Sequence, residues 1–78
     1  MLLLLDIGNT HTHVGLARGA RISRQTNIPT REWFAGEGLA HLRRFVGAVR
    51  PTGAALCSVV PNATPRVCKA LQDICKLR

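Results

Sequence analysis

The first apolar run of the chain covers residues 2–7 and is interrupted only by Asp6, next to its end. A continuous run of this length, followed here by Gly8, is typical of a β-strand buried on both faces. Beyond the glycine the pattern changes to alternation, which predicts a second strand with one buried side. The residues on that side are Thr12, Val14 and Leu16.

A more polar segment follows the second strand. Arg18 and Gly19 separate the two, and glycine at such a turn accepts a positive φ at no steric cost. Residues 20–27 are predicted to return as a third strand with Ile22 facing inward. The polarity of this segment indicates either a solvated face or a position at the edge of the sheet.

Helical spacing replaces alternation between Thr30 and Pro51. The apolar residues three or four positions apart are Ala35, Leu39, Leu42, Val46 and Val49. Threonine caps helix N-termini, Glu32 suits the first turn, and proline stops a helix. We therefore predict one helix that is capped by Thr30, ends before Pro51 and is weakened by internal glycines. These glycines are Gly36, Gly38 and Gly47.

A second apolar run, residues 53–60, predicts another buried strand that ends at Pro61. Thr64 and Pro65 then begin a second helix, because proline at the first helical position gives up no hydrogen bond. Its apolar stripe consists of Val67, Cys68, Leu71, Ile74 and Cys75. The helix is predicted to run to the last residue, Arg78. The predicted order is βββ-α-β-α, an α/β layer arrangement.

The length and the composition of the chain exclude several classes of protein. A chain of 78 residues forms one small domain, which excludes a two-lobed enzyme with a cleft between its lobes. Residues 2–5 are too short an apolar run to cross a bilayer and lack the features of a secretory signal, so no membrane role is expected. The three cysteines have no paired spacing, which favours a reducing, cytoplasmic setting with all three as apolar filling.

The net charge of +7 is spread along the chain, and only Arg43 and Arg44 are adjacent basic residues. A clustered basic stripe would indicate nucleic acid, whereas a diffuse excess gives a general attraction for anions. We therefore expect no nucleic-acid partner. A non-catalytic, basic nucleic-acid-binding module remains the alternative, with the charge as its sole support and a salt-dependent gel shift as its test.

The stretch from Asp6 to Thr10 brings a carboxylate, a glycine and two short polar side chains to the end of a strand. Gly8 lets the backbone approach a ligand closely, and successive N–H groups at a turn form an anion-binding concavity. Asp6 on a rigid strand can hold Mg²⁺ directly or through water. We interpret the stretch as a site for a polyphosphate and a metal ion. The Walker and dinucleotide glycine motifs are absent from the sequence.

Simpler interpretations exist for the same residues. Asp6 could be a strand-end residue that accepts turn N–H bonds, and Asn9 with Thr10 could form an ordinary turn. His11 and His13 could chelate zinc with a third ligand such as His41 or Cys57, although a partly exposed pair is the simpler interpretation.

The segment Asp6–Leu16 resembles the first phosphate motif of type III pantothenate kinases, members of the acetate and sugar kinase, Hsp70 and actin superfamily. The DxGNT core close to Met1 is characteristic of that family, and Cys57–Pro61 resembles its SSVVP stretch. The resemblance implies that residues 1–78 are the N-terminal portion of a ribonuclease H-like (actin-like ATPase) lobe, which is incomplete here.

The resemblance also implies a function. Family members phosphorylate pantothenate with ATP in the first step of coenzyme A synthesis, as cytoplasmic homodimers that use Mg²⁺ and a monovalent cation (K⁺ or NH₄⁺). The family's catalytic aspartate has no position in this chain, so no catalytic residue is assigned and the chain alone is expected to be inactive. Asp6 is the implied metal ligand. The implied ATP-binding residues are Asp6, Ile7, Gly8, Asn9, Thr10, His11, Thr12 and His13. Another small-molecule kinase of the superfamily is an alternative, against which the Cys57–Pro61 stretch argues.

Overall fold

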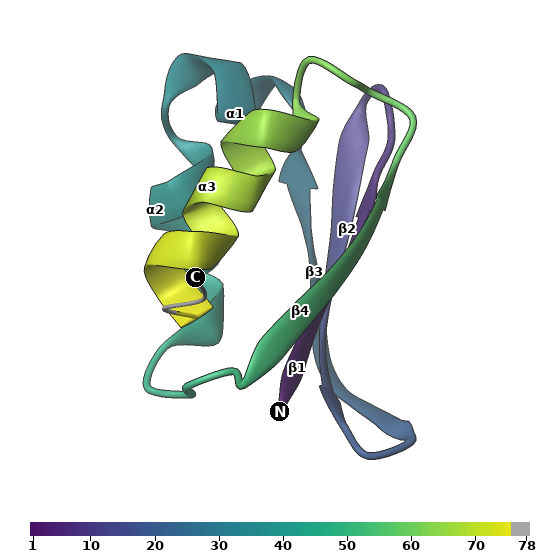
Figure 1. Cartoon of the computed structure of the whole chain (residues 1–78), viewed down its shortest axis with the longest axis vertical. Helices are drawn as coiled ribbons and strands as arrows, with labels where there is room; N and C mark the ends of the chain where they lie inside the picture. Colours follow the sequence, from purple (N-terminus) through teal and green to yellow (C-terminus); the bar gives the residue numbers. More distant parts are fainter. Residues whose placement is uncertain (76–78) are drawn as a thin grey trace.

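A computed structural model describes residues 1–75 as a four-stranded mixed sheet with helices on one of its faces (Figure 1). The elements are β1 Leu2–Ile7, β2 His11–Arg18, β3 Arg21–Pro29, α1 Arg31–Ala35, α2 Gly38–Val46, β4 Gly53–Ser58 and α3 Thr64–Cys75. The α/β class is confirmed, and so is the order of elements except for a divided first helix. The predicted extension of the last helix over residues 76–78 lies outside the described residues.

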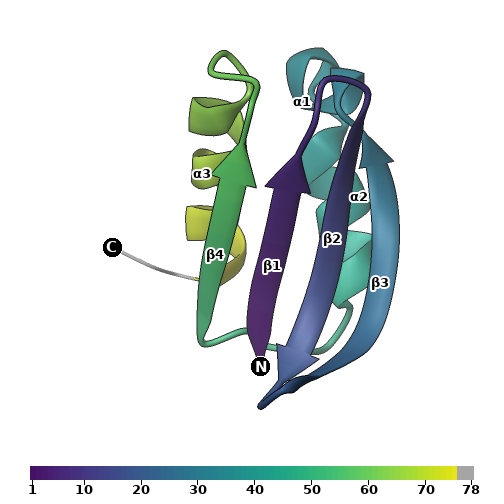
Figure 2. The ribbon, with the colours of Figure 1, turned by 90° about the vertical axis from the view of Figure 1, so that its right-hand side faces the viewer.

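The sheet has the strand order β3-β2-β1-β4, with β1 antiparallel to β2 and parallel to β4. Within the described residues β3 pairs with β2 and with no other strand, which confirms the edge position, one of the two alternatives predicted for it. The chain passes from β3 through α1 and α2 to β4 on the helical side. Figure 2 views the sheet from the opposite side, with all helices behind it.

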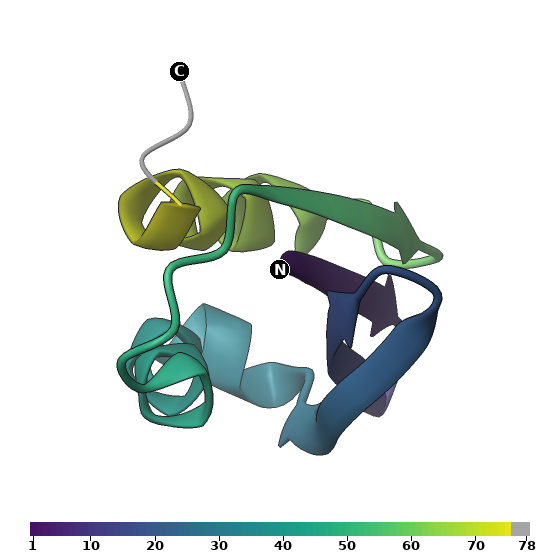
Figure 3. The same cartoon turned by 90° about the horizontal axis from the view of Figure 1, so that it is seen from below.

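The core lies between the sheet and the helices, which Figure 3 shows together on one side of the strands. Strand residues alternate between the two faces of a sheet, so every second residue of β1 points into this core. The largest fully buried side chains are Leu3, Ile7, Leu16, Ile28, Leu42, Val67, Thr12 and Thr30. Trp33 on α1 is also buried, with 4% of its surface exposed.

The other face of the sheet is open, which corrects the prediction that β1 and β4 are buried on both faces. Leu2 is 46% exposed and Asp6 is exposed, whereas their neighbours on the helical side are buried. β4 is at most half-buried along its length. An unbroken apolar run therefore indicates a strand with two apolar faces. Within residues 1–75 the helices cover one of these faces and leave the other open.

Ile22, predicted to face inward, instead lies on the open face and is 48% exposed. The reason is a register shift between β2 and β3, where Leu16 pairs with Arg24 but Ala17 pairs with Ile22. Ser23 is the extra residue of this bulge, and its hydroxyl donates to the backbone oxygen of Leu16 at 3.1 Å. One extra residue moves every later side chain to the opposite face.

The predicted single helix is two helices, because glycines interrupt it. Gly36 adopts φ 86° and its N–H donates to Glu32 O, which ends α1. Gly47 adopts φ 59° and ends α2 before Pro51 is reached. Positive φ is accessible to glycine and costly for other residues, so these positions end helices rather than only weakening them.

Two further features of this region bear on earlier predictions. Thr30 stands at the start of α1 but makes no side-chain capping bond, which corrects its predicted role as a helix cap. His41 Nδ1 on α2 lies 3.0 Å from Glu32 Oε1 on α1, so this pair joins the two helices across the break.

No helix within residues 1–75 is both long and apolar enough to cross a membrane.

Candidate functional site

The turn between β1 and β2 lies at the end of the sheet where β1 and β4 both reach their last residues (Figure 2). The two strands stay joined past their ends, because Val59 N–H donates to Ile7 O at 3.0 Å. Ligands of open α/β sheets bind outside the carboxyl ends of parallel strands. The stretch singled out in the sequence therefore occupies the position where such sheets bind ligands.

Gly8 allows this turn to be narrow. Its N–H donates to His11 O at 2.9 Å. A Cβ atom built on Gly8 would stand 3.1 Å from that same oxygen, closer than such contacts normally come. The backbone φ of Gly8 is not positive, so the requirement for glycine here comes from close approach rather than from conformation.

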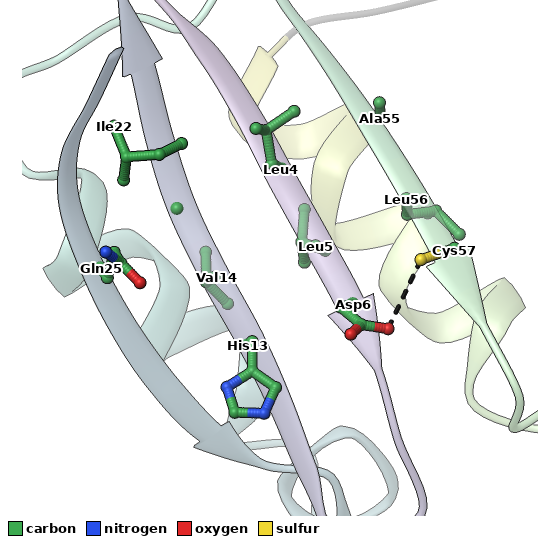
Figure 4. A pocket seen from close by; sticks show the side chains of 11 residues that line it. Leu4, Leu5, Asp6, His13, Val14, Ile22, Gln25, Ala55, Leu56 and Cys57 are labelled. Atoms are coloured by element: carbon green, nitrogen blue, oxygen red, sulfur yellow. Dashed lines mark hydrogen bonds between the residues drawn. The ribbon is translucent and has the colours of Figure 1, made fainter.

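A row of three chemically active side chains crosses the open face next to the turn (Figure 4). Asp6 is the register partner of His13 on β2 and of Cys57 on β4, and all three are exposed. The Cys57 thiol donates to Asp6 Oδ1 at 3.4 Å. A hollow of about 500 Å³ lies along this row and is lined mainly by apolar side chains of the open face, including Leu4 and Ile22.

The helical side of the turn holds a buried hydrogen-bond network that sequence reasoning missed. Thr30 Oγ1 donates to Gly8 O at 2.7 Å and lies 3.1 Å from Thr12 Oγ1. Trp33 Nε1 donates to Thr12 Oγ1 at 3.1 Å. Thr30 carried a helix-capping signal in the sequence, and no local pattern indicates that its hydroxyl bonds a turn 22 residues away.

Comparison with known proteins shows the family of the chain. The sequence model of a family described as "Type III pantothenate kinase" matches residues 2–78, nearly the whole chain. The chain belongs to the type III pantothenate kinase family. Its architecture is that expected for the first part of an actin-like ATPase lobe, with the DxGNT stretch in the turn after β1.

Curated relatives of the family show how much of a member this chain represents. The chain is 36% identical over 64 residues to a type III pantothenate kinase of Frankia casuarinae, a match that covers 81% of the chain and 26% of that relative. It is 38% identical over 72 residues to one of Acidothermus cellulolyticus, covering 86% and 28%. The chain therefore spans about a quarter of the length of these type III pantothenate kinases.

The residues from Asp6 to His13 divide between the two sides of the sheet. The side chains of Asp6, Asn9, Thr10, His11 and His13 are exposed, Gly8 is half-buried, and Ile7 and Thr12 are fully buried. The Thr12 hydroxyl is already bonded to Trp33 and Thr30, so it is not free to bind a ligand. Ile7 likewise belongs to the core.

The exposed side chains at the turn suit a magnesium ion better than a zinc ion. Within residues 1–75 no group of three or more His, Cys, Asp or Glu side chains is placed to hold a metal ion, so the zinc alternative finds no third ligand there. Mg²⁺ keeps several waters and is bound by one or two carboxylates together with substrate phosphates. One exposed carboxylate, Asp6, beside a narrow backbone turn meets that requirement.

Cys57 differs from the predicted apolar filling, since its side chain is exposed and bonded to Asp6. The hydrogen bond to Asp6, together with the negative charge of that carboxylate, raises the pKa of the Cys57 thiol above its usual value. The thiolate is the reactive form of cysteine, and a raised pKa lowers its fraction at any pH below the pKa. The pairing with Asp6 therefore disfavours the reactive form of Cys57.

Replacing Asp6 by asparagine is expected to make Cys57 more reactive. The change removes the negative charge that disfavours the thiolate, so the pKa of Cys57 falls and its thiolate fraction at pH 8 rises. The measurement is the rate of alkylation of Cys57 by iodoacetamide, followed by mass spectrometry. Asp73→Asn serves as the control and should leave that rate unchanged. Equal rates in the Asp6 variant and the parent chain would contradict the pairing of Asp6 with Cys57.

Proposed function

We propose that the turn between β1 and β2 binds the phosphates of Mg-ATP, as part of a type III pantothenate kinase that transfers the γ-phosphate of ATP to pantothenate. The observation that carries the proposal is the family's DxGNT motif at the carboxyl edge of β1 and β4, with its carboxylate exposed beside a narrow turn. Phosphoryl transfer depends mainly on positioning and charge neutralisation, and a motif of this kind supplies both.

The residues of the turn have separate roles in this proposal. Asp6 holds Mg²⁺, which when bound neutralises the charge of phosphate oxygens. The backbone N–H groups of Asn9 and Thr10 make no hydrogen bond within the described residues, so they are available as donors to phosphate. The exposed side chains of the same two residues add further donors. His11 and His13 lie at the edge of the site. Ile7 and Thr12 are fully buried and both backbone groups of Gly8 are bonded within the chain, so these three residues support the turn rather than donate to the ligand.

The remaining properties belong to a whole family member rather than to these residues. We propose pantothenate as the acceptor substrate, a monovalent cation (K⁺ or NH₄⁺) as a second ion, a homodimer as the assembly and a cytoplasmic location. Residues 1–78 form the N-terminal portion of the ribonuclease H-like lobe in this proposal. They contain no catalytic residue, so the chain alone should release no ADP from ATP in the presence of pantothenate. A coupled ADP-release assay checks this, and pantothenate-dependent turnover would refute it.

Binding of Mg-ATP by the chain tests the proposed site directly. In a ¹H–¹⁵N NMR titration, we expect saturable shifts centred on the amides of residues 8–11, weaker with AMP because AMP lacks the β- and γ-phosphates. The net charge of +7 attracts anions in general, so a second titration with ATP and EDTA is the control. Shifts spread over the surface arginines and independent of Mg²⁺ would contradict the site.

A further inference from the structure

The hydrogen bonds behind the turn form a chain with a defined direction. Thr30 Oγ1 carries one proton, which it donates in a hydrogen bond to Gly8 O at 2.7 Å. The contact of 3.1 Å between the Thr30 and Thr12 hydroxyls must therefore use the proton of Thr12. Thr12 Oγ1 in turn accepts the indole N–H of Trp33 at 3.1 Å. Each group thus donates to the next, from Trp33 on α1 to the carbonyl of Gly8.

Thr30 also holds the turn at a second point. Its backbone N–H donates to Thr10 O at 2.9 Å. One residue therefore bonds two carbonyl groups of the turn, those of Gly8 and Thr10, and Thr30 itself is only 2% exposed. Hydrogen bonds in such a buried setting are stronger than at the surface, and their loss leaves buried polar groups without partners.

These two bonds fix the direction of neighbouring N–H groups. In a trans peptide the C=O and the following N–H point in opposite directions. Because Gly8 C=O and Thr10 C=O are directed at Thr30, the N–H groups of Asn9 and His11 are directed away from it. Of these, the N–H of Asn9 is one of the two donors proposed for phosphate. Backbone N–H groups bind an anion when several of them point the same way.

We propose that Thr30 is a positioning residue that holds the β1–β2 turn in its anion-binding conformation. Through Thr12 and Trp33, the same hydrogen-bond network connects the conformation of the turn to the position of α1 against the sheet. Thr30 touches neither nucleotide nor metal in this account and acts only through the backbone of residues 8–11. The part of the inference that concerns phosphate rests on the proposed function, whereas the part that concerns the conformation of the turn does not.

Two variants of Thr30 separate its hydroxyl from its bulk. Thr30→Val keeps the shape and removes the proton donor, and Thr30→Ser keeps the donor. In the ¹⁵N-labelled chain without ligand, Thr30→Val should shift the amide resonances of Asn9 and His11 and speed their hydrogen exchange, and Thr30→Ser should restore the values of the parent chain. Affinity for Mg-ATP should fall by about tenfold in the valine variant and by no more than about twofold in the serine variant.

Leu71→Ala, which truncates a buried side chain on α3, is the control for effects that come from a loss of stability alone. This variant should lower the free energy of unfolding without moving the signals of the turn. If the valine variant leaves the Asn9 and His11 amides unchanged, Thr30 does not hold the turn and the inference is wrong. If those amides change but Mg-ATP affinity does not, the positioning role is overturned. If the parent chain binds no Mg-ATP, the proposed function fails, and the ligand-free spectra still decide whether Thr30 holds the turn.

Discussion

Replacing Asp6 by asparagine together with Gly8 by valine is expected to weaken Mg-ATP binding by about a hundredfold or more. The first change removes the carboxylate proposed to hold Mg²⁺, and the second places a branched side chain where even a Cβ would stand 3.1 Å from His11 O. Each change removes an interaction worth roughly tenfold in affinity, and the two act on different parts of the ligand. The measurement is the dissociation constant from the NMR titration.

A matched double variant controls for general effects of charge and bulk. Asp73→Asn removes a carboxylate on α3, and Gly15→Ala adds a methyl group on β2 whose nearest neighbours would be 3.7 Å away. This variant should bind Mg-ATP as the parent chain does. Equal affinity of the Asp6 and Gly8 variant and the parent would remove the turn from the nucleotide site, although the family membership would stand on the sequence match.

Replacing Gly38 by alanine is expected to destabilise the chain by about 1–3 kcal/mol or more, although alanine normally stabilises a helix relative to glycine. A Cβ on Gly38 would stand 2.3 Å from Trp33 Cε3 and 2.7 Å from two further ring atoms. The indole is 4% exposed and hydrogen-bonded through Nε1, so it cannot move aside freely. A domain of this size has a total stability of only about 4–12 kcal/mol, so the loss is a large share of it.

Urea denaturation followed by the fluorescence of Trp33, the one tryptophan of the chain, measures this effect. Gly15→Ala is the control, since its methyl group has room and its free energy of unfolding should stay within about 0.5 kcal/mol of the parent. If Gly38→Ala were as stable as the parent, Trp33 would not pack over the start of α2. The hydrogen bond from its indole to Thr12 would then be in doubt as well.

The sequence by itself determined the elements that depend on short-range patterns. The apolar run of β1 gave the bounds Leu2–Ile7, and alternation identified the buried side of β2. Gly19 adopts the positive φ that the predicted turn requires. The candidate site was also found from local signals, because a carboxylate, a glycine and small polar residues follow one another at the end of a strand. Its role in binding Mg-ATP stays a prediction.

Only the tertiary structure decided which groups act on that site from a distance. The bulge at Ser23 turned Ile22 to the open face, and Gly36 divided the predicted helix. Thr30 matched a helix cap by its residue type, yet its hydroxyl bonds Gly8. Local patterns record the preferences of a few neighbouring residues. The partner of a buried hydroxyl depends instead on how a helix and a hairpin settle against each other, and that is determined only when the layers pack.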